Sequence, residues 1–180
     1  MLFTKRLLPL IAILAATAFS VSAQAGDLDG TFVTGAISTS SASDTVSSAS
    51  SSEAGKTITV GVGYAIPVAD GAVSLGVVGE AVISFGGSST RSIGASFQPG
   101  YYLSDDVVVY GKIGVVSESR SGDSLSGTTV GIGLKYLIAP NTFIGGEIEQ
   151  IKFTAPTNST TGTTYNLKDT RISGKLGYVF

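Results

Sequence analysis

Apolar residues recur at every second position along most of the chain after residue 25. Between residues 57 and 67, for example, the alternating positions are Ile58, Val60, Val62, Tyr64 and Ile66. This is the period of a β-strand, whose successive side chains point to opposite faces. Because Val, Ile, Thr and Tyr also outweigh the helix-forming residues, the pattern predicts strands throughout this region.

Eight runs of this kind follow one another. They cover residues 30–38, 57–67, 72–85, 91–103, 106–120, 128–138, 142–154 and 169–180. Most exceed the about five or six residues that are usual for strands in soluble proteins. Several reach the about 9–11 residues that a tilted strand needs to cross a membrane.

The connections between the runs alternate in length. Short turns are expected at 68–71, 104–105 and 139–141, whereas the other connections are mostly longer and polar. The first of these, residues 39–56, is rich in Ser and Thr, and we expect it to be a disordered loop. Short turns at one end and longer loops at the other are typical of an outer-membrane barrel. The sequence therefore predicts an all-β fold, an eight-stranded antiparallel up-and-down transmembrane β-barrel.

The first 25 residues have a different character. Lys5 and Arg6 precede an apolar run over residues 7–18, and a stretch of small residues then ends in Ala23-Gln24-Ala25. This is the pattern of a secretory signal peptide with an A-x-A cleavage site, and the run is too short to span a membrane as a helix. We expect residues 1–25 to be removed during export and residues 26–180 to form the barrel domain.

The few charged residues, 13% of the chain, concentrate on one face of the predicted strands. The lipid-facing side of a membrane barrel must be apolar, so this charged face is expected to line the lumen. The predicted lumen charges are four acids and four bases: Glu80, Lys112, Glu118, Lys135, Glu147, Glu149, Arg171 and Lys175. The strand order predicts these neighbours: Glu147 and Glu149 beside Arg171 and Lys175, and Lys112 or Glu118 near Lys135.

This balance of charge bears on function. Eight strands enclose a space that side chains just fill, and a charge buried there must be paired. We therefore expect a polar plug in place of an open pore. Small residues predicted on the lumen face, such as Gly61, Gly63, Gly131 and Gly133, leave room for water, so a small porin or narrow channel is the alternative function.

Composition excludes several classes of protein. The chain has no Cys and no His, so the commonest general base and the commonest metal ligand are both missing, and no enzyme activity, metal or cofactor is expected. A mean hydropathy of +0.37 is too apolar for an ordinary soluble protein. The net charge is −2 and no basic patch stands out in the sequence, so nucleic acid is not an expected partner.

The last seven residues, Gly174-Lys175-Leu176-Gly177-Tyr178-Val179-Phe180, resemble the C-terminal assembly signal of bacterial outer-membrane proteins. That resemblance implies that the barrel-assembly machinery reads Gly174, Leu176, Tyr178 and Phe180. Outer-membrane lipid and lipopolysaccharide are the other expected partners, and the extracellular ligand of the loops stays open.

Two internal stretches carry a further resemblance. Gly100-Tyr101-Tyr102-Leu103-Ser104-Asp105-Asp106 and Gly131-Ile132-Gly133-Leu134-Lys135-Tyr136 resemble segments of the opacity-protein and porin-like barrel family. The resemblance implies a barrel similar to the membrane domain of outer-membrane protein A, in the outer membrane of a Gram-negative bacterium. It also implies a structural or surface-interaction role through the extracellular loops. Tyr101, Tyr102, Tyr136 and Tyr178 are expected in the belt at the periplasmic membrane interface.

Overall fold

The computed structural model describes residues 28–46, 49–85, 91–120, 123–154 and 166–180, and these form eight strands. The strands are β1 (Gly30–Val46), β2 (Ala49–Val68), β3 (Val73–Phe85), β4 (Arg91–Ser104), β5 (Val107–Arg120), β6 (Asp123–Ala139), β7 (Thr142–Thr154) and β8 (Asn166–Val179). Within these residues, no helix has the length and hydropathy needed to cross a membrane.

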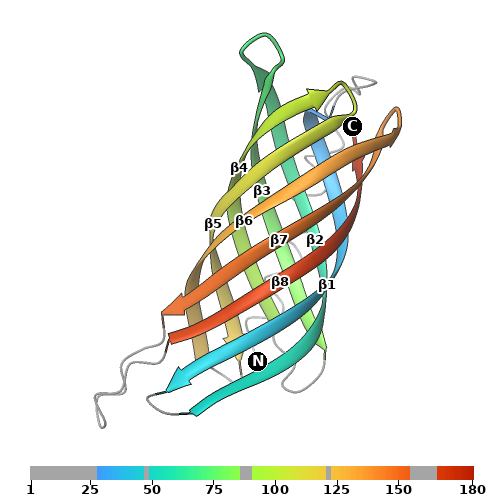
Figure 1. Ribbon diagram of the computed structural model, residues 1–180. Helices are drawn as coiled ribbons and strands as arrows, with labels where there is room; N and C mark the ends of the chain where they lie inside the picture. Colours follow the sequence, from blue (N-terminus) through green and yellow to red (C-terminus); the bar gives the residue numbers. More distant parts are fainter. Residues whose placement is uncertain (1–27, 47–48, 86–90, 121–122, 155–165) are drawn as a thin grey trace.

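Each strand pairs with its neighbours in sequence, and β8 closes the sheet by pairing with β1 (Figure 1). All of these pairings are antiparallel. Closure leaves no unpaired strand edge, which is the condition for a sheet to sit in lipid. The predicted fold class, an eight-stranded antiparallel up-and-down barrel, is confirmed.

The three expected short connections all lie at one end of the barrel, which we call the turn end (Figure 1). In the β2–β3 turn, Ala69 and Asp70 have φ angles of 53° and 56°, and the amide of Gly71 donates to the Val68 carbonyl at 3.2 Å. Phe180 also lies at this end, where its amide donates to the Thr31 carbonyl at 2.8 Å. The opposite end of the barrel is called the loop end.

The expectation of a disordered loop over residues 39–56 is wrong. β1 runs on to Val46 and β2 starts at Ala49, and the two strands stay in register from the pair Thr39–Lys56 to the pair Val46–Ala49. A hairpin that projects beyond the lipid needs no apolar face, because its backbone hydrogen bonds are made between its own two strands. The same preference for pairing lets β6 begin at Asp123, ahead of the predicted residue 128.

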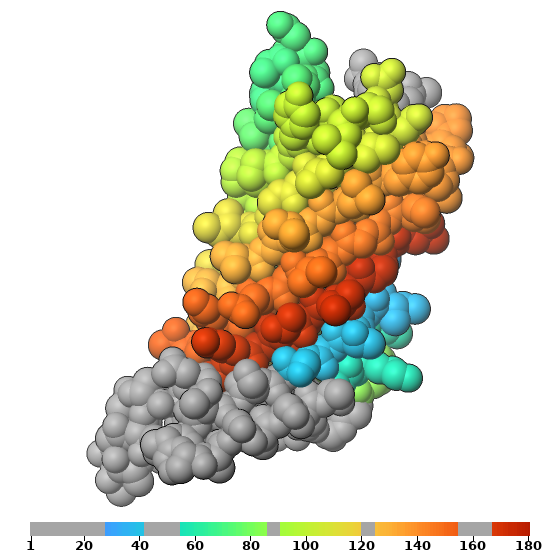
Figure 2. Space-filling model, viewed as in Figure 1, coloured from blue at the N-terminus to red at the C-terminus, as the bar shows by residue number. Residues whose placement is uncertain are grey.

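The outer face of the barrel is apolar. Ile132 on β6 and Ile172 on β8 have exposed fractions of 66% and 58%, and similar side chains cover the other strands. Figure 2 shows the strands as slanted bands that form one face of this wall. Alternation along each strand therefore separates an apolar outside from an inside of different character.

Three of the four tyrosines expected in the interface belt face outward, and Tyr102 does not. Tyr101, Tyr136 and Tyr178 are exposed on the outer wall near the turn end. Tyr102 instead points inward, where its hydroxyl donates to Asp29 Oδ2 at 2.8 Å. Consecutive strand residues face opposite sides, so Tyr101 and Tyr102 could not both belong to the belt.

The interior is arranged in layers along the barrel axis. An apolar cluster fills the turn end and consists of Leu28, Phe32, Ala65, Val78, Val108, Tyr110, Leu137, Phe143 and Val179. A smaller cluster toward the loop end contains Val116, Ile151 and Phe153. The charged side chains lie between these two clusters and form the candidate site.

Candidate functional site

All eight of the charged side chains that were assigned to the lumen point into the barrel. They come from β3, β5, β6, β7 and β8, and the most accessible carboxylate among those in ion pairs is Glu80, whose side chain is 12% exposed. Each sits on the strand parity opposite to the apolar outer face. The local sequence pattern alone thus directs these charges inward.

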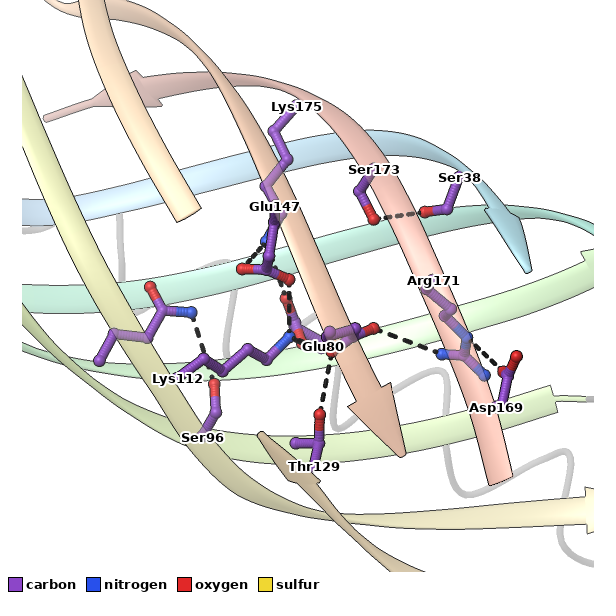
Figure 3. A network of polar contacts seen from close by, with 12 residues as sticks. Ser38, Glu80, Ser96, Lys112, Thr129, Glu147, Asp169, Arg171, Ser173 and Lys175 are labelled. Carbon is purple, nitrogen blue, oxygen red and sulfur yellow. Dashed lines mark hydrogen bonds and ion pairs between the residues drawn. The ribbon is translucent and has the colours of Figure 1, made fainter. Parts of the chain in front are cut away.

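Lys112 is the centre of the network (Figure 3). Its Nζ lies 2.6 Å from Glu80 Oε2, 2.8 Å from Glu149 Oε2 and 3.1 Å from Glu147 Oε1. These carboxylates come from β3 and β7, which are not neighbours of β5, so the contacts cross the lumen. An ammonium group has three donors, and here each has a carboxylate within reach.

Glu147 is the most connected acid. Its Oε2 lies 2.7 Å from Lys175 Nζ and accepts a hydrogen bond from the Tyr110 hydroxyl at 2.8 Å. Lys175 also lies 3.5 Å from Glu80 Oε1. Only 1% of the Glu147 side chain is exposed, and a carboxylate buried to this degree requires such partners.

Arg171 extends the network toward the loop end (Figure 3). Its Nε donates to Asp169 Oδ2 at 2.9 Å, and its guanidinium lies 3.8 Å from Glu149 Oε1 and 4.0 Å from Glu118 Oε2. Thr129 donates to Glu149 Oε2 at 3.1 Å. The carboxylate of Glu149 therefore joins the Lys112 half of the network to the Arg171 half.

The expected balance of four acids and four bases is wrong. Asp29 and Asp169 are also buried in the interior, so the described residues place six acids there against four bases. Asp169 had a signal in the sequence, since it shares its strand parity with Arg171. Asp29 precedes the first strand, where alternation gives no guide, and it is held by hydrogen bonds from Ser74 at 2.5 Å and from Tyr102.

Lys135 does not lie beside Lys112 or Glu118 as expected. The register pairs Lys135 with Val108 and Lys112 with Gly131, which separates the two lysines along the barrel. Lys135 Nζ instead lies 4.2 Å from the ring centre of Phe32, with the rings of Tyr110 and Phe143 at 5.2 and 5.5 Å. The charge is accommodated by cation–π contacts at the border of the apolar cluster.

These three aromatic rings close the turn end of the lumen, and the sequence analysis missed them. Phe32 and Phe143 meet edge to face, with centroids 6.1 Å apart. Each ring packs over a glycine directly opposite on the next strand, and the pairs are Phe32–Gly63, Tyr110–Gly133 and Phe143–Gly177. The lumen glycines were expected to leave room for water, but aromatic rings fill the space at Gly63 and Gly133. The sequence signal that could have revealed this layer is an aromatic residue paired with a glycine on the neighbouring strand.

One small cavity lies among the charges. The cavity beside Glu80, Thr129, Glu149 and Arg171 measures about 20 Å³, which is room for about one water molecule. A larger hollow of about 700 Å³ is lined by residues such as Val62, Tyr64 and Val77, but no charged residue lines it.

The ion pairs of the interior form one connected set, which we call the ionic lattice. Its members are Glu80, Lys112, Glu118, Glu147, Glu149, Asp169, Arg171 and Lys175. Among the described residues, no group of three or more His, Cys, Asp or Glu is placed to hold a metal ion. The carboxylates at the centre of the lattice are directed at ammonium and guanidinium groups. These ion pairs can hold strands β3, β5, β7 and β8 at fixed distances across the lumen.

The residues of the expected assembly signal lie on the other side of the wall. Gly174, Leu176 and Tyr178 are exposed on the outer face of β8. The Phe180 ring meets that of Tyr178 edge to face, with centroids 5.1 Å apart. Gly174, Leu176 and Tyr178, with the half-buried Phe180, thus form one apolar strip that ends at the turn end.

Comparison with known proteins gives the same architecture. The family model for the outer membrane protein beta-barrel domain matches residues 11–180. Neisserial surface protein A is similar in structure, with a TM-score of 0.59 and 17% identity over 84% of this chain and 100% of that one. The outer membrane enzyme PagL has a TM-score of 0.50 and 13% identity over 81% and 99% of the two chains. The attachment invasion locus protein Ail of Yersinia pestis has a TM-score of 0.47 and 14% identity over 84% and 100%. No curated protein sequence matches this chain.

Proposed function

This chain belongs to the outer-membrane β-barrel family, and we propose that it serves there as a closed, non-catalytic barrel that presents its loop end to the cell's surroundings. The protein resides in the outer membrane of a Gram-negative bacterium, as the members of this family do. Its role would be structural or one of surface interaction, without transport through the lumen.

The filled lumen is the observation that carries this proposal. The aromatic rings of Phe32, Tyr110 and Phe143 occupy the turn end, and the Lys112 lattice occupies the middle. Crossing ions would have to break buried ion pairs, and each such pair costs several kcal/mol to separate. The contacts therefore favour a barrel that is shut at rest.

The β1–β2 hairpin supports a role at the surface. Its backbone ladder continues to the pair Val46–Ala49, well past the level where β3 ends opposite Lys56. A paired hairpin has a defined backbone course, which a loose loop does not. We propose that this hairpin contacts an extracellular ligand and that the barrel-assembly machinery recognises the strip formed by Gly174, Leu176, Tyr178 and Phe180.

A narrow channel is the second candidate function. It is favoured by the continuous run of charged groups from Lys175 through Glu147, Lys112 and Glu149 to Arg171. Such a lattice could exchange partners and pass small ions if the aromatic layer moved. The two functions differ in one measurable property, the conductance of the folded barrel.

We also propose that the protein is not an enzyme, and its composition and buried carboxylates support this. Barrel enzymes share this fold, as PagL illustrates, so architecture leaves catalysis open. The chain has no His and no Cys to act as a general base or thiol nucleophile. Five of its six buried carboxylates are in ion pairs, and the cavity beside Glu80 and Glu149 is too small to admit a substrate.

Recording from single barrels in a planar bilayer tests the proposal. The refolded wild-type chain is expected to insert without conductance steps, and heat-modifiable migration on a gel verifies that it is folded. Steady conductance that Glu147→Gln or Lys175→Gln abolishes would establish the channel and remove the closed-barrel proposal.

A further inference from the structure

Exposed charges of opposite sign lie at opposite ends of the outer wall. Among the residues whose side chains the structure describes, the exposed bases are Lys56, Arg91, Lys152 and Lys168, and the exposed acids are Asp70, Asp105 and Asp106. All four bases lie toward the loop end, whereas the acids lie in the β2–β3 and β4–β5 turns. Among the side chains that the structure describes, the exposed charges of the loop-end rim are thus all positive.

Three successive rows of outward side chains across β6, β7 and β8 show how this charge meets the membrane. The first row is Ile132, Ile148 and Ile172, the second is Val130, Gln150 and Thr170, and the third is Thr128, Lys152 and Lys168. The rows change from apolar to mixed to cationic. Lys152 is four positions after Ile148, which is about 13 Å along the strand and about 10 Å in height for a tilted barrel strand. The third row is the first of the three without an apolar side chain, so the apolar band of the outer wall ends below it.

The two lysines in the third row face each other directly. Lys152 and Lys168 are cross-strand partners in the β7–β8 ladder, and both are exposed. Directly opposed side chains have Cβ atoms about 4.5–5.5 Å apart, and like charges in that position repel and destabilise the sheet. Neither lysine has an ion pair among the described residues. The unfavourable pair becomes favourable once an anion with several oxygens lies between the two ammonium groups.

We propose that Lys152 and Lys168 form a binding site for a phosphate group of a phosphorylated glycolipid, the lipid A part of lipopolysaccharide in the outer leaflet. The acyl chains would lie along the isoleucine row below, and the phosphate would be held by the two ammonium groups. Thr128, Gln150 and Thr170 surround the pair with further hydrogen-bond donors. The proposal rests on the loop end facing outward, as in barrels with short periplasmic turns, and is independent of whether the lumen conducts.

Phosphate fits the site better than a protein partner does. The anion must lie at the level of the membrane surface, because the row immediately below is already semi-polar and the next is fully apolar. A protein ligand would reach the projecting β1–β2 hairpin before it reached this level. The source of the phosphate is distinguishable, because phosphatidylglycerol carries a phosphate but lacks the sugar and the second phosphate of lipid A.

Native mass spectrometry of the refolded full chain, titrated with lipid A in detergent, tests the site. The double variant Lys152→Gln/Lys168→Gln is expected to bind lipid A about 25-fold more weakly, since each lysine near an anionic surface contributes about fivefold. Lys56→Gln is the matched control, because Lys56 is exposed at the same rim and its cross-strand partners are Thr39 and Phe85. It should lose about fivefold at most, and Lys152→Arg/Lys168→Arg should stay within about twofold of wild type.

A comparison of lipids with the wild-type chain gives an arm that needs no variant. Dephosphorylated lipid A keeps its acyl chains and sugars and lacks the phosphates. Its affinity for the wild-type chain should be no higher than the affinity of intact lipid A for the double glutamine variant. Equal binding of lipid A to wild type and to a folded double variant would overturn the site. Equal binding of lipid A and phosphatidylglycerol to wild type would overturn the assignment to a glycolipid.

Discussion

Phe143 on β7 lies directly opposite Gly177 on β8, and its ring fills the space where a side chain at position 177 would begin. The same relationship recurs between Phe32 and Gly63 and between Tyr110 and Gly133. Three aromatic–glycine pairs thus support the layer that closes the turn end. Because the rings fill the interior so tightly, the glycines are as necessary as the rings.

Replacing Gly177 by Ala should destabilise the barrel. The new methyl group would overlap the Phe143 ring, and overpacking of this kind costs about 1–3 kcal/mol. Urea unfolding of the barrel refolded into vesicles measures the change. Gly35→Ala is the control, because a Cβ there meets nothing within 4 Å, and it should leave stability almost unchanged. The double variant Phe143→Leu/Gly177→Ala should recover part of the loss; additive losses would show that the ring and the glycine are not coupled.

Replacing Lys112 by Met should destabilise the barrel more strongly, by about 3–5 kcal/mol, because Glu80, Glu147 and Glu149 would lose a shared counter-ion in a buried site. The same unfolding assay applies. Adding Glu147→Gln to Lys112→Met should restore part of the stability by removing one of the uncompensated charges. Lys56→Gln, which changes an exposed lysine on β2, should have little effect. A loss of similar size in both lysine variants would contradict a special role for Lys112.

Opening the aromatic layer alone should leave the barrel closed, because the ion pairs of Lys112 still occupy the middle of the lumen. In the variant Phe32→Ala/Phe143→Ala, the two buried rings that meet at the turn end are removed, and Lys135 loses two of its three aromatic contacts. Single-barrel recording of the folded variant is expected to show no conductance steps, as for the wild-type chain. The control is Phe97→Ala, which removes an outward-facing ring. Conductance steps in the double variant would mean that the rings, and not the ion pairs, seal the lumen.

Deleting Phe180 should impair assembly in cells more than folding in the test tube. Its ring extends the exposed strip of Gly174, Leu176 and Tyr178, and its amide adds one backbone hydrogen bond to Thr31. In cells, we expect unfolded precursor to accumulate, as judged by loss of heat-modifiable migration. Refolding of the purified truncated chain into vesicles should remain close to normal. If both assays fail alike, Phe180 supports stability and is not a recognition signal.

Much of the fold followed from the period of the sequence. Alternation with a period of two placed Glu80, Lys112 and the other predicted charges on the face opposite the apolar wall, because strand residues must alternate between the two sides. The three tight turns followed from short runs of turn residues between the strands. The hairpin of β1 and β2 was missed because its Ser- and Thr-rich sequence lacks apolar alternation, although its backbone pairs as well as any other.

The partners of the charges could not be read from the chain. Lys112 reaches Glu80 and Glu147 only because closure brings β3, β5 and β7 to face one another across the lumen. The register sets Lys135 away from Lys112 and beneath three aromatic rings.

The sequence by itself determined that this protein is an eight-stranded barrel with an apolar exterior and charges inside, since those features depend on local alternation. Only the tertiary structure decided that the lumen is filled, that Asp29 and Asp169 give it an excess of acid, and that Lys152 and Lys168 stand side by side. Each of these depends on register and on closure, which bring together residues that are far apart along the chain.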